Sequence, residues 1–589
     1  MPDFRQRIAF IVTIAILLAG SNSSVNAQTE SPRPNILLIV ADDMGYSDVG
    51  PFGGEIRTPS LDRLAQSGLA MTNFYVGPAC SPTRSMLMSG NDHHVAGMGT
   101  NAEAIAPNQI GQPGYEGYFN DRVVSVASLL RDGGYHTYMA GKWHLGEEPE
   151  HDASKRGFER SYTMLQGGAS HFDDEWMMCA NYTPIYREDG KRVHVPRDFF
   201  STEFYTDKLI EYIDEQQDDS PFLAYLAYTA VHDPLHVPDD WIDRYEGIYD
   251  VGYDAVREQR LERMVKLGIV PRGTKPGPWL QTVPKWSDLD PDQREKEARR
   301  MEVYAAMVEN IDFHVGRLLE YLRKTGRYEN TLIIFFSDNG ANGFEMHMYP
   351  DTDEAWVDRN SDNRFSNWGR RGSRIAQGPG WAQVSSTPFR LFKGFIAEGG
   401  IRAPLIVSGP GVQGAGGLNT DAILHVMDIA PTLLELAGVE HPATFDGRDI
   451  VPMQGESWAQ MMAGEVQSPR GAEDWLGWEL FGNRAIRQGD WKISWLYEPY
   501  GIWDWQLYNL AEDPGEQHDL SEQFPEEKTR LIALWDEYVE MNGVIVGNRS
   551  PFEGASKALP NAVTESDNYP PVRGLEAIPH QRLIELFSQ

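Results

Sequence analysis

The chain has 589 residues, of which 41% are hydrophobic and 11% aromatic, and its formal net charge is −34 at pH 7. This length predicts one large domain with at least one smaller one, and this hydrophobic content excludes a disordered chain. So acidic a surface repels phosphate backbones and anionic lipid heads, so we expect neither nucleic acid nor membrane among the partners. An anionic substrate would need a local basic pocket.

The N-terminal residues have the pattern of a secretory signal. Arg5 and Arg7 precede an apolar run at 8–20, and Val25-Asn26-Ala27 supplies the small residues of a cleavage site. The apolar run is too short to span a bilayer. We therefore expect a signal peptide at 1–27 and an exported protein, periplasmic or secreted; the alternative is an uncleaved anchor. The chain has only two cysteines, Cys80 and Cys179, so an exported form holds at most one disulfide.

Apolar runs alternate with helical patterns along most of the chain. The runs predict strands at 34–40, 135–140, 221–227, 331–336 and 404–407, and the patterns predict helices at 58–65, from 80, at 124–131, 206–216 and 297–326. Near-continuous apolar strands separated by helices indicate an α/β sandwich with a large, mostly parallel sheet. Residues 245–295 read as a long insertion and 341–385 as an irregular loop.

The composition changes after residue 455. A hairpin is predicted at 483–495, a further strand at 505–510 and an amphipathic helix at 525–539. We therefore predict a catalytic domain at 28–455, a smaller C-terminal α+β domain with an antiparallel sheet at 456–545, and a tail at 546–589.

Four of the predicted strands end in polar residues. In a parallel sheet, ligands bind beyond the carboxyl ends of the strands, so these residues are expected to share one pocket. They are Asp42-Asp43, Lys142 with His144, His232, and Asp338-Asn339.

The oxygen-bearing members of this set predict a site for a hard cation. Asp42, Asp43, Asp338 and Asn339 offer ligands that suit Ca²⁺ or Mg²⁺, not zinc. Each pair also has a structural alternative, since Asn-Gly favours a hairpin turn and adjacent aspartates cap helices. Adjacent histidines point in different directions, so His93-His94 is expected to pack or line a pocket.

The segment Cys80-Ser81-Pro82-Thr83-Arg84 predicts a reactive position. Pro82 suits the first turn of a helix, which would place Cys80 just ahead of exposed N–H groups and Arg84 on the same turn. A sulfur, a helix N-terminus and an arginine describe an anion site with a potential nucleophile. The alternative is a buried structural thiol.

These motifs together resemble the type I sulfatases. Cys80–Arg84 with Ser89-Gly90 is similar to the signature in which the family's cysteine is oxidised to formylglycine, with Ser89 where threonine is usual. Residues 141–146, the acids after the first strand and the tip at 337–340 also match. The resemblance covers about residues 33–540 and is strongest to bacterial arylsulfatases.

The resemblance implies an alkaline-phosphatase-like fold and hydrolysis of a small sulfate monoester, for an aryl sulfate to a phenol and sulfate. It implies formylglycine at position 80, made by a formylglycine-generating enzyme, whose hydrate is the nucleophile. It implies Ca²⁺, less plausibly Mg²⁺, bound by the four oxygen-bearing residues and residue 80.

The same resemblance assigns roles to the basic residues. Arg84 would orient the nucleophile, and Lys142 and Lys393 would neutralise sulfate oxygens. His232 would be the acid for the leaving oxygen, and His144 the base that drives release of sulfate. Alternative functions are a phosphonate monoester or phosphodiester hydrolase of the same superfamily, a carbohydrate sulfatase, and a non-catalytic exported binding protein with an unmodified Cys80.

Overall fold

The computed structural model describes residues 33–179 and 183–547. The predicted signal peptide at 1–27 and the predicted tail after residue 547 lie outside the described residues. Among the described residues, no helix is both long enough and apolar enough to cross a bilayer.

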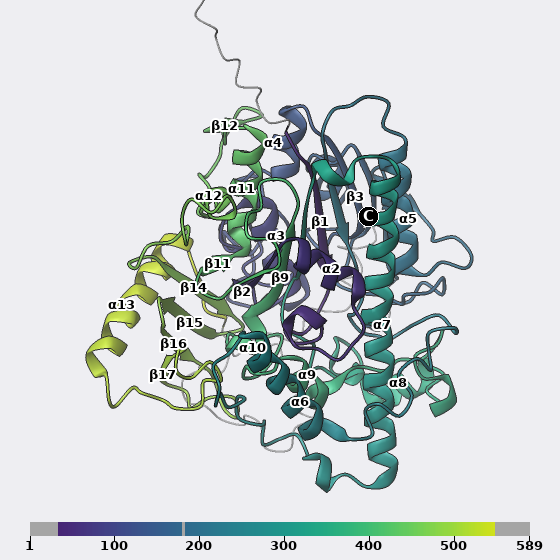
Figure 1. The fold of residues 1–589 in the computed structure, drawn as a ribbon, viewed down its shortest axis with the longest axis vertical. Coiled ribbons are helices and arrows are strands. Elements are labelled where there is room, and N and C mark those ends of the chain that lie inside the picture. Colours follow the sequence, from purple (N-terminus) through teal and green to yellow (C-terminus); the bar gives the residue numbers. More distant parts are fainter. Residues whose placement is uncertain (1–32, 180–182, 548–589) are drawn as a thin grey trace, which may run out of the picture. The chain divides into compact units, whose positions relative to one another are not determined.

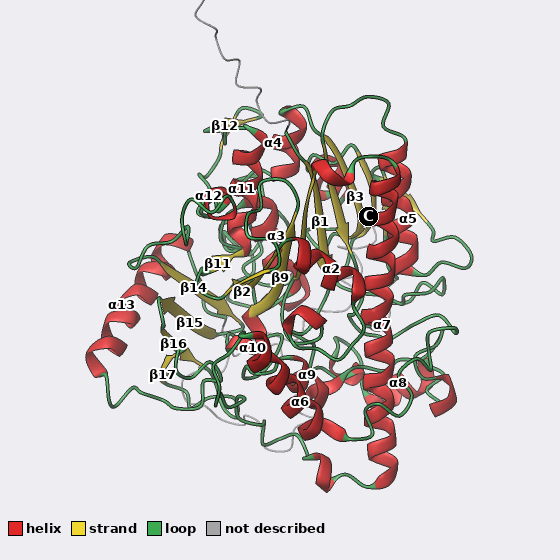
Figure 2. Ribbon diagram, viewed as in Figure 1, coloured by secondary structure: helices red, strands yellow, loops and turns green. Residues whose placement is uncertain are grey.

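A large mixed sheet forms the centre of the main domain (Figures 1 and 2). Its strand order is β10-β2-β9-β8-β1-β7-β3-β4-β5-β6, and β11 also pairs with β2. The strands are β1 (Asn35–Ala41), β2 (Leu69–Tyr75), β3 (His136–Lys142), β4 (Arg160–Met164), β5 (Tyr186–Glu188), β6 (Lys191–Val193), β7 (Phe222–Ala227), β8 (Thr331–Ser337), β9 (Arg402–Ser408), β10 (Gly417–Asn419) and β11 (Leu424–His425). The expected mostly parallel sheet is confirmed.

One central strand runs against its neighbours. The strands β8, β1, β7, β3 and β4 pair in parallel, whereas β9 is antiparallel to both β8 and β2. It follows that β2 runs in the same direction as β8. The sequence predicted the run at 404–407 but not its direction, because an apolar run looks the same in either orientation.

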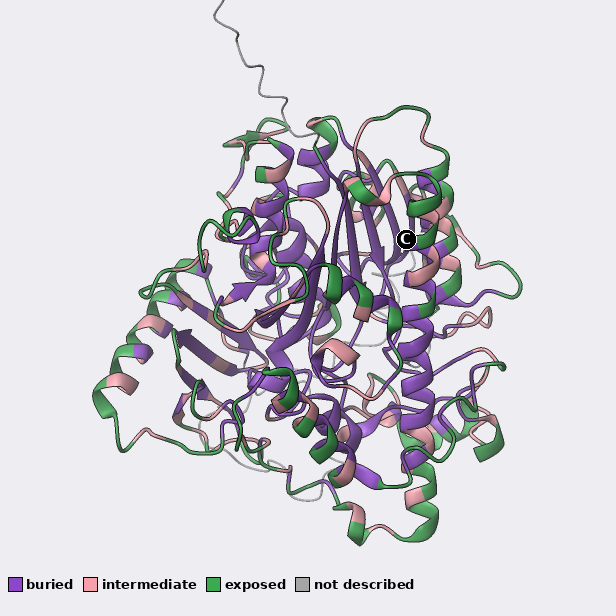
Figure 3. Cartoon of the chain, in the orientation of Figure 1, coloured by how far each residue is buried: buried purple, intermediate pink, exposed green. Residues whose placement is uncertain are grey.

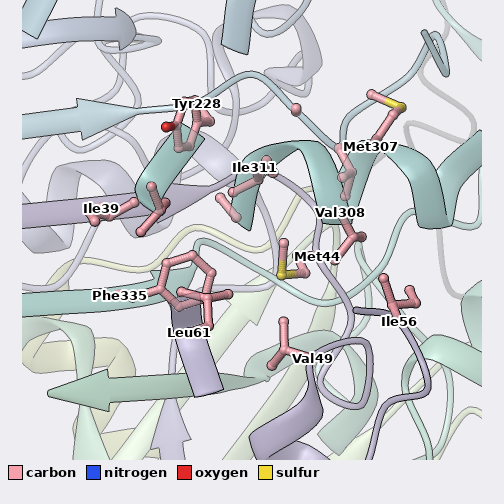
Figure 4. Packing of buried hydrophobic residues seen from close by; sticks show 14 of the residues in the cluster. Ile39, Met44, Val49, Ile56, Leu61, Tyr228, Met307, Val308, Ile311 and Phe335 are labelled. Carbon is pink, nitrogen blue, oxygen red and sulfur yellow. The ribbon is translucent and has the colours of Figure 1, made fainter. Parts of the chain in front are cut away.

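Helices cover both faces of the sheet, so the central strands are buried on both sides (Figure 3). This burial explains why their sequences are apolar throughout. On β1, Leu37 and Ile39 belong to one hydrophobic cluster and Leu38 and Val40 to another. The first cluster includes residues of α2 (Pro59–Ser67), α5 (Ser201–Asp214) and α7 (Pro291–Lys324), and Figure 4 shows its Ile39, Leu61, Ile311 and Phe335. The second includes residues of α3 (Cys80–Ser89), α4 (Val126–Asp132) and α11 (Ile429–Ala437). Burying each such side chain contributes roughly 1.5–3 kcal/mol.

The C-terminal part is the predicted α+β unit. Four antiparallel strands, β14 (Trp475–Leu480), β15 (Asn483–Gln488), β16 (Trp491–Trp495) and β17 (Trp505–Asn509), pack against α13 (Pro525–Asn542). Ile486, Ile493 and Leu507 meet Leu531 and Trp535 in one cluster. The turn at Gly489 closes the predicted hairpin, while β14 was not predicted. The boundary at 455 stays a prediction.

Two segments contain helices that the sequence analysis did not predict. The expected insertion at 245–295 contains α6 (Gly252–Leu267), and α7 begins at Pro291 because Asp290 caps it by accepting from Gln293 N. The expected loop at 341–385 contains α8 (Glu354–Asn360) and α9 (Gly378–Ser385). In α9 the proline lies in the first turn, where it starts a helix instead of breaking one.

Candidate active site

The predicted strand-end residues come together because their strands are neighbours. β8, β1, β7 and β3 are consecutive and parallel, so their carboxyl ends lie at one edge of the sheet. Asp338 follows β8, Asp42 follows β1, His232 comes shortly after β7, and Lys142 ends β3. The structure therefore brings the predicted strand-end residues together at one edge of the sheet.

Cys80 and Lys393 reach the same edge by different routes. Cys80 begins α3, which follows β2; it is the first helical residue, whereas the sequence placed it just ahead of the helix. Lys393 comes before its strand, β9, not after it. Because β9 is reversed, its amino end lies where the other strands end.

The side chains of Asp42, Asp43, Cys80 and Asp338 lie in one buried cluster. One ligand atom from each of the four lies within 4.8 Å of the others. The thiol of Cys80 is 3.3 Å from Asp42 Oδ1, and Asn339 Nδ2 donates to Asp43 Oδ1 at 2.6 Å. The other amide atom, Asn339 Oδ1, is buried and has no hydrogen-bond partner among the described residues.

Three buried cations balance the three carboxylates. Arg84 donates from Nε and Nη2 to Asp338 Oδ2 at 3.0 and 2.8 Å, and Nη1 donates to the backbone oxygen of Lys142. Lys142 Nζ is 2.7 Å from Asp42 Oδ2, and Lys393 Nζ is 2.7 Å from Asp43 Oδ1. An anion arriving here would meet cations already held in place.

The electrostatics of the cluster keep the cysteine protonated. Burial raises the pKa of the Cys80 thiol well above its usual range, and the carboxylates of Asp338 and Asp42 add to the shift. Burial likewise raises the pKa of Asp42, whereas His232 and Lys393 overcome burial and lower the pKa of Asp43. A thiol in this setting is a weak nucleophile.

The backbone is forced into uncommon conformations at two of these positions. Asp43 has φ 62° and His144 has φ 54°, both in the left-handed region that non-glycine residues seldom adopt. Next to His144, a Cβ on Gly141 would lie 1.8 Å from the backbone oxygen of Ala227. Only glycine lets β3 approach β7 this closely.

Two histidines stand at the cluster. His232 Nε2 is 3.4 Å from Asp43 Oδ2, and its Nδ1 is 2.9 Å from the backbone oxygen of Asp233. A Cβ on Gly167 would lie 2.9 Å from His144 Cε1, and one on Gly168 would lie 3.2 Å from His232 Nδ1, so the same glycine pair backs both rings. Burial lowers the pKa of each histidine.

Two family models cover almost the whole described chain. The model described as Sulfatase matches residues 34–439, and that described as N-sulphoglucosamine sulphohydrolase, C-terminal, matches residues 389–541. The chain belongs to the sulfatase family. The resemblance inferred from the motifs is confirmed, and family membership supports hydrolysis of sulfuric esters.

Individual relatives agree with this assignment. This sulfatase is 42% identical over 532 residues to an uncharacterized sulfatase of Schizosaccharomyces pombe, covering 88% of this chain and 96% of that one. It is 41% identical over 465 residues to the arylsulfatase of Klebsiella aerogenes, covering 78% and 98%. The crystal structure of Ps i-CgsB in complex with k-i-k-neocarrahexaose is 25% identical, with a TM-score of 0.62 and coverage of 86% and 92%. The predicted alkaline-phosphatase-like fold is confirmed.

Several residues at the sulfatase site were not predicted. Asn342 Nδ2 and Tyr349 OH both donate to Asp233 Oδ2, at 2.8 and 3.1 Å, which anchors the residue next to His232. Glu103 Oε2 lies 3.5 Å from His144 Nε2. Asp233 and Asn342 are close in sequence to predicted residues and could have been suspected, whereas Glu103 carries no local signal.

The remaining predicted candidates lie elsewhere. His93 and His94 are buried, with ring centroids 4.0 Å apart and ring planes tilted by 36°, and His94 lies between Asp92 and Glu479. Their burial agrees with packing, the favoured interpretation, and together with Asp92 they also place one ligand atom each within 4.8 Å of one another, as in a group that could hold a metal ion. Cys80 and Cys179 are both free thiols here.

Proposed function

We propose that this sulfatase is an arylsulfatase whose residue 80 acts as formylglycine beside a bound Ca²⁺. The observation that carries the proposal is the position of Cys80, whose thiol is buried and protonated among carboxylates with two lysines beside it. The aryl specificity is supported by the 41% identity to the arylsulfatase of Klebsiella aerogenes over 98% of that protein.

The donor set fits a calcium ion. Asp42, Asp43, Asp338 and Asn339 supply oxygens, and the unpartnered Asn339 Oδ1 is a buried acceptor that a cation would satisfy. The sulfur of Cys80 is the one soft atom in the cluster, and an oxygen at position 80 would remove that mismatch. When bound, Ca²⁺ would lower the pKa of a coordinated hydroxyl and hold a sulfate oxygen.

Oxidation of Cys80 to formylglycine would supply what the thiol lacks. A hydrated aldehyde offers one hydroxyl to attack sulfur and a second to expel sulfate, whereas a serine would stay sulfated. Maturation would need a formylglycine-generating enzyme as a partner. Pro82 and Arg84, on the first turns of the helix that Cys80 begins, would be part of the sequence that this enzyme recognises.

The cations would stabilise the sulfate as charge develops. Arg84 is fixed by Asp338 and is therefore suited to orient residue 80. Lys142 and Lys393 are buried and preorganised, so each would neutralise sulfate oxygens without reorganising solvent. The carboxylates that pair with these lysines, Asp42 and Asp43, are two of the proposed ligands of the calcium ion.

The two histidines would move protons. Both nitrogens of His232 face oxygens, Nδ1 the backbone oxygen of Asp233 and Nε2 a carboxylate oxygen of Asp43. Burial lowers the pKa of His232 well below its usual range, so a proton taken up at Nε2 would pass readily to the leaving oxygen. His144 would be the base that takes a proton from residue 80 as sulfate leaves.

A carbohydrate sulfatase is the second candidate. It is supported by the match of residues 389–541 to the N-sulphoglucosamine sulphohydrolase C-terminal model and by the likeness to the carbohydrate-bound Ps i-CgsB structure. Both candidates use the same residues and differ in what binds beyond the sulfate.

Turnover of three substrates separates the candidates. We expect the purified protein, expressed with the maturation enzyme, to hydrolyse 4-nitrophenyl sulfate faster than bis(4-nitrophenyl) phosphate and faster than glucosamine 6-sulfate. Faster cleavage of the phosphodiester would favour the phosphodiesterase alternative. Faster desulfation of the sugar would favour the carbohydrate sulfatase.

We also propose that the protein is exported, on the pattern of residues 1–27. N-terminal sequencing of the protein from the extracytoplasmic fraction should begin at Gln28. Recovery of full-length chain in the cytoplasm would contradict export.

A further inference from the structure

The imidazole of His144 has one nitrogen facing an acid and one without a partner. Nε2 lies 3.5 Å from Oε2 of Glu103, while Nδ1 is buried and has no hydrogen-bond partner among the described residues. In a neutral imidazole one nitrogen donates and the other accepts, and the partner of the donor decides the tautomer. A carboxylate accepts only, so it selects the form with the proton on Nε2.

We propose that Glu103 is a positioning residue that fixes the tautomer and orientation of His144, leaving Nδ1 as the proton acceptor of the site. The inference rests on the proposed function only in giving His144 the role of base. A distance of 3.5 Å is long for a hydrogen bond, but such contacts shorten when substrate binds.

Glu103 is on a turn that the rest of the chain holds in place. It lies in a short 3-10 turn, Ala102–Ala104, whose Ala102 packs closely against Gly117. Further along, Gln109 Nε2 and Tyr115 OH both donate to the backbone oxygen of Ile545, at 2.7 and 2.8 Å. The chain after α13 thus fastens the loop that carries Glu103.

The electrostatics agree with this pairing. Although partial burial acts in the opposite direction, the interaction with His144 lowers the pKa of Glu103 to about 2, so this side chain accepts a hydrogen bond and does not donate one. The side chain is 44% exposed, which lets water reach Glu103 but not Nδ1 of His144. A neighbouring acid, Glu147, accepts from Gln166 Nε2 at 2.9 Å, and within the described part of the chain it forms no ion pair with His144, which makes it a matched control.

The test compares Glu103→Gln, Glu103→Asp and Glu147→Gln in the full-length protein. An amide at 103 can either accept from Nε2–H or donate to Nε2, so it no longer selects the tautomer with the proton on Nε2. We expect Glu103→Gln to lower kcat for 4-nitrophenyl sulfate roughly 10- to 100-fold with little change in KM, the range typical of residues that orient an active-site histidine. Glu103→Asp should recover part of the loss, and Glu147→Gln should resemble the unchanged protein.

A measurement independent of activity completes the test. Nitrogen-15 NMR of histidine-labelled protein, with His144→Asn to assign the signal, should show Nε2–H in the unchanged protein and a shift towards Nδ1–H in Glu103→Gln. The same tautomer and the same kcat in both proteins would overturn the inference. A tautomer change in a protein that does not cleave any sulfate ester would leave this inference intact and overturn the proposed function instead.

Discussion

The segment that follows β1 carries two buried acidic pairs with different surroundings. Asp42 and Asp43 belong to the candidate active site, and Asp48 and Glu55 surround the guanidinium of Arg260. Arg260 donates to Asp48 Oδ1 at 2.6 Å and, through two nitrogens, to the oxygens of Glu55 at 2.7 and 2.8 Å. Both clusters are buried and both balance carboxylates with cations.

The two clusters differ in whether every polar atom is satisfied. In the Arg260 cluster, Tyr304 OH and Ser385 Oγ complete the bonding of Asp48, and Tyr249 OH completes that of Glu55. In the active-site cluster, Asn339 Oδ1 and the nearby His144 Nδ1 have no partner among the described residues. A saturated network stabilises the fold, whereas the unpartnered atoms beside the carboxylate cluster are available to a ligand.

Replacing the side chain of residue 80 should have the largest effect on activity. Cys80→Ser keeps the volume of residue 80 but cannot be oxidised in the same way, so we expect activity on 4-nitrophenyl sulfate to fall on the order of 10⁴-fold or more. The thermal unfolding midpoint should stay close to that of the unchanged protein. Cys179→Ser is the control and should keep full activity; an equal loss in both variants would contradict the assignment.

Removing the cation of the saturated cluster should act on stability instead. Arg260→Ala leaves the buried Asp48 without its cation and Glu55 with only Arg263, 3.9 Å away, which should cost about 3–5 kcal/mol of unfolding free energy. Denaturant unfolding measures this. Arg57→Ala breaks an ion pair whose arginine side chain is 56% exposed, so it should cost only about 0–1 kcal/mol. If Arg260→Ala lowers kcat without lowering stability, the Arg260 cluster serves activity and the distinction between the two clusters is wrong.

A third cluster predicts a pH dependence of stability. His94 lies between Asp92 Oδ1, at 2.7 Å, and Glu479 Oε2, at 3.3 Å; burial opposes its charge, but the two acids raise its pKa to about 9. Because the folded pKa lies above the unfolded value, this contribution is complete below about pH 6.5 and is lost as pH rises through 9, a change of ~3 kcal/mol. His94→Gln should abolish that part of the pH dependence. If His94→Gln loses as much stability between about pH 6.5 and 9 as the unchanged protein does, His94 is not charged in the folded state.

Removing the proposed Ca²⁺ from the active-site cluster should have a slightly smaller effect on stability than the loss of Arg260 or of the His94 charge. Chelation by EGTA should abolish activity, and added Ca²⁺ should restore it. The unfolding free energy should rise by about 2.7 kcal/mol when free Ca²⁺ is 100 times its Kd. Asp43→Asn should remove this calcium-dependent gain, while Arg260→Ala should keep it.

The sequence predicted the site residues that follow a continuous apolar run. Asp42, Asp338, Lys142 and His232 follow apolar runs, and adjacent parallel strands bring such ends together. The proposed metal ligands and Cys80 also carried motifs. Their chemical roles stay proposals, because geometry shows proximity and not reaction.

The features that the sequence did not predict depend on the direction of a strand or on contacts between residues far apart in the chain. The reversal of β9, which delivers Lys393, follows from pairing with β2 and β8 and leaves no mark on the strand itself. The strand β2 was missed because Leu69–Tyr75 is interrupted by polar residues. Glu103 lies next to His144 in a loop, 99–117, that is held by hydrogen bonds to Ile545, a contact between residues far apart in the sequence.

Mass spectrometry of the peptide that contains Cys80 tests the central claim most directly. In protein produced together with a formylglycine-generating enzyme, we predict a peptide whose residue 80 is an aldehyde, which reacts with a hydrazide probe. An intact thiol at position 80 in protein that hydrolyses 4-nitrophenyl sulfate would contradict the account.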